Sequence, residues 1–185
     1  KTVRLPDGTE YTFLAGEEKG IDVRIALESA CFQAAAITAM GAEVRKLDGM
    51  IRNPPFHQWL AVECTEAESG RAVLRIPPKK DFVGNPFVPA VHGGIIAALI
   101  DLAGGAALFV DLEFPTPTID MRVDYLRPAI AGRALVAEAR VKNLGKTVAF
   151  VDVDVRDDQD RLVATGRATY SVKDREAGPR GFPIG

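Results

Sequence analysis

A His-Gly-Gly turn stands directly before a long apolar run that carries one ionisable side chain. The turn is His92-Gly93-Gly94, and the run continues to Phe109 with Asp101 as its single charged residue. Two glycines at a helix start leave backbone N–H groups open to a ligand oxygen, and the positive helix end favours negative charge there. A lone carboxylate among Ile, Ala and Leu carries a desolvation cost. Together these features predict an active site.

The spacing of Gly93 and Asp101 limits how the two groups can cooperate. The Gly93 N–H suits an oxyanion donor, and Asp101 suits a general base on water or a nucleophile that attacks the carbonyl itself. Eight residues separate them, which is about 12 Å along one helix. An attacking atom must lie about 3 Å from its target. We therefore expect that the two groups of one chain do not serve the same carbonyl.

Composition and charge narrow the class of protein. The 185 residues suit one domain with an appended segment, and 47% apolar and 26% charged residues are ordinary for soluble proteins. A formal net charge of −2 lacks the basic excess of nucleic-acid-binding proteins. Cys31, Cys64, His57 and His92 have neither the number nor the spacing of a disulfide framework or a zinc site. We expect a cytoplasmic protein with no metal and no nucleic-acid partner.

No segment has the pattern of a signal peptide. The run 91–110 is long enough to cross a bilayer. It contains Asp101 and four glycines, however, and lies between strand-patterned segments. We therefore expect a buried helix and no membrane partner.

The first 50 residues read as an extension. Apolar residues flank Pro6-Asp7-Gly8, which predicts a small hairpin over 3–13. A helical period of apolar residues predicts an amphipathic helix from about 22 to 47, and Pro54-Pro55 ends any helix. We expect an N-terminal extension over 1–50, a folded domain over 51–175 and a C-terminal tail over 176–185.

The folded domain is patterned as two strands, one long helix and four strands. Alternation and turn residues predict strands over 58–66 and 71–76, then a polar loop and the apolar helix at 93–110. Four further strands are predicted over 118–126, 133–143, 146–156 and 161–173. A helix that is apolar on most sides must be wrapped by sheet, so we expect an α+β fold.

From about Phe56 to Val172 the sequence resembles the hotdog-fold acyl-CoA thioesterases. It looks most like the PaaI-like branch of the 4-hydroxybenzoyl-CoA thioesterase superfamily. The resemblance rests on the joint order and spacing of several pieces, namely Asn85, His92-Gly93-Gly94, Asp101, 120–129, 145–150 and 164–168. It implies a hotdog fold, with an antiparallel sheet wrapped around the central helix and a helical N-terminal extension.

The resemblance also implies how the catalytic groups cooperate. In such thioesterases the carboxylate comes from one subunit and the glycine from its dimer mate, so a homodimer would be required, and a homotetramer is possible. Asp101 would act as base or nucleophile, Gly93 as oxyanion donor, and His92 would bind the thioester oxygen or hold the loop. Asn85 aligns with a residue that orients water, although a turn role before Pro86 is the alternative. Thr118 aligns with a residue that hydrogen-bonds the carboxylate or water.

Coenzyme A would be part of the substrate, and no separate cofactor is implied. An excess of Arg and Lys over 115–150 suits its phosphates. The resemblance places the nucleotide against the turn after the second of the four strands. The candidate CoA-binding residues are Gly94, Arg127, Asn143, Gly145, Lys146 and Thr147.

The leading hypothesis is a thioesterase that hydrolyses a small, medium-sized or aromatic acyl-CoA. A hotdog hydratase or dehydratase acting on acyl thioesters is an alternative, but that chemistry commonly pairs His with an acid, and this helix offers Asp101 and no Glu. A non-catalytic acyl-CoA-binding module is the other alternative. The presence of both Asp101 and the Gly93 turn argues against it.

Overall fold

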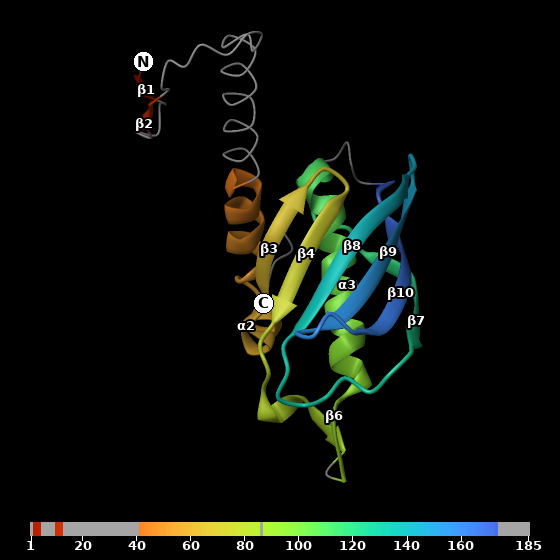
Figure 1. Ribbon diagram of the computed structural model, residues 1–185. Coiled ribbons are helices and arrows are strands. Elements are labelled where there is room, and N and C mark those ends of the chain that lie inside the picture. The colour runs from red at the N-terminus through yellow and green to blue at the C-terminus, as the bar shows by residue number, and fades with distance from the viewer. Residues whose placement is uncertain (1, 5–9, 13–40, 86, 174–185) are drawn as a thin grey trace, which may run out of the picture. The chain divides into compact units, whose positions relative to one another are not determined.

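The computed structural model describes residues 2–4, 10–12, 41–85 and 87–173 (Figure 1). The chain divides into two compact units, 1–40 and 41–185. In the first unit, β1 (Thr2–Arg4) pairs antiparallel with β2 (Glu10–Thr12), which confirms the predicted hairpin. Residues 22–40 of the predicted amphipathic helix and the predicted tail 176–185 lie outside the described residues. The division of the chain at 50 and 175 stays a prediction.

The second unit is an antiparallel six-stranded sheet in the order β3-β4-β8-β9-β10-β7, with one long helix, α3 (Gly93–Leu112), behind it (Figure 1). The arrangement confirms the predicted antiparallel sheet around a central helix. The strands are β3 (Glu63–Glu68), β4 (Arg71–Ile76), β7 (Thr118–Tyr125), β8 (Leu135–Leu144), β9 (Val148–Asp157) and β10 (Leu162–Ser171).

Strict alternation decides which face of the sheet is buried. In β9 the side chains of Val151, Val153 and Val155 are at most 1% exposed and face the core. Asp152, between them in sequence, faces outward and pairs with Arg167 of β10 at 2.6 Å. The period of two therefore separates an apolar inner face from a charged outer face.

Helix α3 forms the centre of the core. It packs against all six strands of the sheet, and Leu99, Ile100 and Leu108 are fully buried. By length and composition α3 could cross a membrane, yet 56% of its most apolar window is buried inside the fold. At Gly166 of β10 a Cβ would lie 2.6 Å from Ile100 Cγ2, so this glycine lets strand and helix approach closely.

Residues 41–51 are helical and pack on this core. Leu47 and Ile51 are buried within it, and Asp48 accepts a hydrogen bond from the Cys64 backbone N–H at 2.9 Å. Lys46 pairs with Glu113, which follows the last residue of α3, at 2.5 Å. The segment is thus fastened to both β3 and the end of α3.

Two local predictions were wrong. Residues 58–60 were expected to be strand, but Pro55 starts a short helix, α2 (Pro55–Leu60), which ends at Ala61 in the left-handed region with a φ of 53°. Proline suits a first helical turn, where its missing N–H is not needed. The expected polar loop before α3 instead holds a short 3-10 helix and a two-stranded hairpin, namely η1 (Lys80–Phe82), β5 (Val83–Asn85) and β6 (Val88–Val91).

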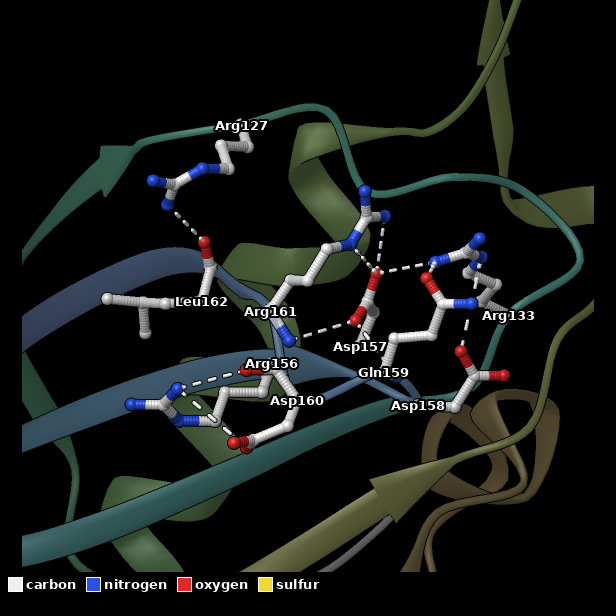
Figure 2. A network of polar contacts seen from close by, with 9 residues as sticks. All are labelled: Arg127, Arg133, Arg156, Asp157, Asp158, Gln159, Asp160, Arg161 and Leu162. Atoms are coloured by element: carbon white, nitrogen blue, oxygen red, sulfur yellow. Dashed lines mark hydrogen bonds and ion pairs between the residues drawn. The ribbon is translucent and has the colours of Figure 1, made fainter.

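A buried carboxylate organises the turn between β9 and β10 (Figure 2). Asp157 accepts hydrogen bonds from the backbone N–H groups of Gln159 and Arg161, both at 3.0 Å. The guanidinium groups of Arg161 and Arg133 donate to its other oxygen, at 2.6 Å and 3.1 Å. Because its side chain is fully buried, this charge depends on these partners.

Candidate active site

Asp101 lies at mid-length of α3 with its carboxylate half-buried. Thr118, the first residue of β7, donates its hydroxyl to Asp101 Oδ1 at 2.5 Å. The family resemblance implied that Thr118 hydrogen-bonds the carboxylate or water, and the structure shows the bond to the carboxylate. A short hydrogen bond from a hydroxyl group to a carboxylate oxygen fixes the orientation of the carboxylate.

A cavity of about 320 Å³ opens beside Asp101 and Thr118, and most of its wall is apolar. Helix α3 forms one side, and the segment 41–51 with the start of α2 contributes to the rest. Its other lining residues are Leu47, Met50, Ile51, Pro54, His57, Leu102, Gly105, Ala106, Phe109, Pro115, Thr116 and Tyr170. A mostly apolar cavity with a few polar groups is the usual form of a small-molecule site.

The N-terminus of α3 is capped by the residue before it. His92 Nδ1 accepts a hydrogen bond from the Gly94 N–H at 2.9 Å. An accepting Nδ1 places the proton of the neutral ring on Nε2. The expectation that both glycine amides are open is therefore wrong for Gly94. Among the described residues, the Gly93 N–H has no acceptor and is the free donor of this turn.

Close packing holds His92 and Gly93 in place. The Tyr125 hydroxyl donates to the Gly93 carbonyl at 2.9 Å, and a Cβ on Gly93 would lie 3.2 Å from the same ring. A Cβ on Gly84 of β5 would lie 2.8 Å from His92 Cα. Glycine at both positions lets the hairpin and β7 approach the helix start.

A second hollow of about 420 Å³ lies at this helix start. Gly93, Tyr125 and Arg127 line it, together with Val91, Ile96, Leu126, Pro128 and Ala129. Arg127 donates to the Leu162 carbonyl at 2.9 Å, and this bond holds its guanidinium in place (Figure 2). Gly93 and Arg127 therefore line the same hollow, while their binding roles stay predictions.

Gly93 and Asp101 line different hollows of the same protomer. Because α3 is continuous from Gly93 to Leu112, their eight-residue separation is about 12 Å along the axis. The predicted separation of the two groups within one chain is confirmed.

Neither Asn85 nor the turn after β8 forms a hydrogen bond with Asp101 among the described residues. Asn85 is exposed on β5, and its Oδ1 accepts from the Phe87 N–H at 2.8 Å, which is the turn role. In the other segment the Gly145 N–H donates to the Val148 carbonyl at 3.0 Å. Asn143, Lys146 and Thr147 there are exposed, and none of them lines either hollow. Their binding roles stay predictions.

Three residues at the cavity were not singled out by the sequence. His57 lines it with Nδ1 bonded to the Ile51 carbonyl at 2.8 Å. Within the described part of the chain, the buried Thr116 Oγ1 has no hydrogen-bond partner. Tyr170 donates its hydroxyl to the Asp101 carbonyl at 2.9 Å. Strand alternation could have placed Tyr170 on the inner face of β10, but its partner depends on how the strand crosses α3.

Residues 89–164 match the Thioesterase superfamily. Human acyl-coenzyme A thioesterase 13 is 36% identical over 137 residues, which span 72% of this chain and 96% of that protein. The chain belongs to the thioesterase superfamily. The medium/long-chain acyl-CoA thioesterase YigI of Escherichia coli is 30% identical over 133 residues, which span 64% of this thioesterase and 85% of YigI.

Solved structures agree with this assignment. A mutant of the phenylacetic acid degradation protein PaaI from Thermus thermophilus is 29% identical, with a TM-score of 0.58 over 64% of this chain and 98% of that one. The resemblance to the PaaI-like branch and the hotdog fold are thereby confirmed. The thioesterase is accordingly a thioester hydrolase.

Proposed function

We propose that the protein hydrolyses acyl-CoA thioesters to the free acid and CoA, within the range of small, medium-sized and aromatic acyl groups. The observation that carries this proposal is the position of a hydrogen-bonded carboxylate, Asp101, beside a mostly apolar cavity. Such a cavity can hold an acyl group while its carbonyl lies at the carboxylate. The acyl-CoA thioesterase relatives support the same reaction.

In the proposed reaction the thioester oxygen accepts from the Gly93 N–H as negative charge develops on it. Asp101 either takes a proton from the attacking water or attacks the carbonyl carbon directly. In both routes the C–S bond breaks, the CoA sulfur leaves and is protonated, and a water oxygen ends in a carboxyl group. Removing one oxyanion donor typically lowers the rate by about 10²–10³.

The proposed site is shared between two subunits. One carbonyl cannot meet both groups of one chain, because they lie about 12 Å apart on α3 and line different hollows. A dimer that brings the Gly93 amide of one protomer to Asp101 of the other supplies both. Dimerisation is then a catalytic requirement.

Thiol release from a panel of acyl-CoAs tests the activity. We expect the wild type to release CoA, and Asp101→Asn to lose at least about 10³ in kcat while it keeps its melting temperature. An exposed carboxylate changed in the same way, Asp158→Asn, serves as control and keeps full activity. No CoA release from any acyl-CoA by the purified oligomer, or full activity of Asp101→Asn, contradicts the proposal.

Mixed oligomers test the shared site. Asp101→Ala subunits and Gly93→Val subunits are each expected to be inactive alone. The first lack the carboxylate, and in the second the added side chain blocks the approach to the Gly93 N–H, which lies against the Tyr125 ring. A hybrid dimer contains one site with both intact groups, so mixing should restore part of the activity. No recovery after mass spectrometry has confirmed hybrid dimers contradicts a site shared across subunits.

A further inference from the structure

The cavity at Asp101 follows one stripe of α3. Five of its lining residues come from this helix, namely Asp101, Leu102, Gly105, Ala106 and Phe109. The spacings of three, four and eight residues place all of them on one face. The cavity therefore runs lengthwise along the helix, away from Gly93, with the carboxylate at its near end.

Residue size along this stripe changes from small to large. Gly105 and Ala106 form the middle, and the space beside Gly105 is open, since a Cβ there would first meet a Tyr170 ring atom at 4.0 Å. Phe109, which is 8% exposed, is the last α3 residue of the lining. Along the helix, two small lining residues of this channel are thus followed by a phenyl ring at the C-terminal end of the stripe.

The wall on the side of segment 41–51 is also apolar. Leu47 and Ile51 are buried, and Met50 is 42% exposed at the channel edge. None of the channel's lining residues is Lys or Arg. The nucleotide part of CoA, with its phosphates, is thus a poor occupant, whereas the acyl part suits this wall.

The helix gives the length of the channel. Asp101 and Phe109 are eight residues apart, about 12 Å along the axis. With C–C bonds of about 1.5 Å, a chain that reaches Phe109 contains at least roughly eight carbons. A single aromatic ring would fill only the near half.

We propose that this channel selects the acyl group by its length. It binds unbranched acyl chains of about eight carbons or somewhat more, and Phe109 sets the upper limit of chain length. The proposal rests on the proposed function, because it takes Asp101 as the group beside the thioester carbonyl. It narrows the substrate class to medium-chain acyl-CoAs. Phe109 and Ala106 are then specificity-determining residues of the same site.

The wild type should show a clear chain-length profile. In a series from acetyl-CoA through butyryl-, hexanoyl-, octanoyl- and decanoyl- to dodecanoyl-CoA, kcat/KM should rise about fourfold for each methylene buried, which corresponds to about 0.8 kcal/mol. It should level off or fall once the chain passes Phe109. Activity that is equal at every length overturns the channel but leaves the hydrolase function intact, whereas no hydrolysis at any length contradicts the function itself.

Two variants should move the profile in opposite directions. Phe109→Ala opens the far end, so the best substrate becomes longer by two or more carbons. Ala106→Leu blocks the middle of the channel. The value of kcat/KM for octanoyl-CoA should therefore fall at least tenfold, whereas the values for acetyl- and butyryl-CoA should change much less. Because the two changes are independent, a folding defect in one leaves the other as the test.

Phe114→Ala is the matched control. Phe114 is also 8% exposed and lies five residues beyond Phe109, but it does not line the channel. We expect a loss of thermal stability like that of Phe109→Ala with an unchanged chain-length profile. If both Phe variants shift the profile alike, or neither does, Phe109 is not the end of an acyl channel.

Discussion

The hydroxyl of Tyr170 lies against the backbone of α3 at the position where Gly104 leaves room for it. Tyr170 is 1% exposed and donates to the carbonyl of Asp101 at 2.9 Å. A Cβ on Gly104 would overlap this hydroxyl and lie 2.9 Å from the ring carbon that bears it. Burial raises the pKa of Tyr170 well above its usual range, so the group stays a donor. The strand thus contacts the helix at Asp101, whose carboxylate is the proposed catalytic group.

Gly104→Ala should therefore destabilise the protein and displace Asp101. Overpacking typically costs about 1–3 kcal/mol, which outweighs the roughly 1 kcal/mol that alanine gains over glycine in a helix. We expect a lower melting temperature and a lower kcat. Adding Tyr170→Phe removes the overlapping oxygen and should recover part of both losses, measured as a double-mutant cycle.

The neighbouring glycine provides the stability control for this cycle. Gly105→Ala meets no heavy atom closer than 4.0 Å and should raise the free energy of unfolding by about 1 kcal/mol. Additive effects of Gly104→Ala and Tyr170→Phe would show that the two residues do not share a contact.

Removing the hydroxyl of Thr118 should impair catalysis more than folding. Thr118→Val keeps the shape of the side chain but deletes the 2.5 Å bond to Asp101. A hydrogen bond to a charged group is worth about 1.5–3 kcal/mol, so kcat should fall by about ten- to a hundredfold. Thr118→Ser retains the hydroxyl and should keep most of the activity; equal losses in the Val and Ser variants would exclude this role.

Much of the fold follows from residue periodicity. The alternation in β9 and the apolar run before Phe109 predicted a half-buried strand and a wrapped helix, because burial is set by side-chain period. Helix α3 extends two residues beyond its predicted end at 110. The prediction that a strand begins at residue 58 was wrong, because a six-residue helix begins at Pro55 in this apolar segment. Short apolar runs do not distinguish helix from strand.

The site was predictable where one helix carries it and less so elsewhere. The separation of Gly93 and Asp101 followed from helix geometry, whereas their site roles stay predictions from residue types and the family resemblance. His92 as a cap for Gly94 and Tyr170 as a partner of Asp101 depend on a ring rotation and on a strand crossing. Leu47 and Met50 of the cavity wall come from the predicted extension 1–50, and their docking on the core is a tertiary contact that periodicity does not encode.

Replacing Thr116 by valine should stabilise the ligand-free protein. Its buried Oγ1 has no partner within the described residues, and an unsatisfied buried hydroxyl costs about 1–3 kcal/mol. Thr116→Val should raise the midpoint of urea unfolding without changing its slope. Thr118→Val serves as the control and should not raise the midpoint, because the Thr118 hydroxyl is hydrogen-bonded to Asp101. A lower midpoint for Thr116→Val would indicate that the hydroxyl has a partner in solution.

Asp157 should make the fold sensitive to acid. Hydrogen bonds from Arg161, with those from the Gln159 N–H and Arg133, hold the pKa of its carboxyl far below the usual range. The folded state therefore binds fewer protons than the unfolded state in acid. The stabilisation is complete above the unfolded pKa and is lost progressively as the pH falls below about 5. Urea unfolding at neutral pH and at successively lower pH measures this slope.

Asp157→Asn should make that slope shallower and lower stability at neutral pH by about 3 kcal/mol, because Arg161 and Arg133 lose a buried charged partner. The next residue is the matched control. The Asp158 side chain is 50% exposed and only 4.0 Å from Arg133 Nε, so Asp158→Asn should change the free energy of unfolding by less than about 1 kcal/mol and keep the wild-type acid slope. If Asp157→Asn retains the wild-type slope, the acid sensitivity arises from other carboxylates and the β9–β10 turn does not depend on this charge.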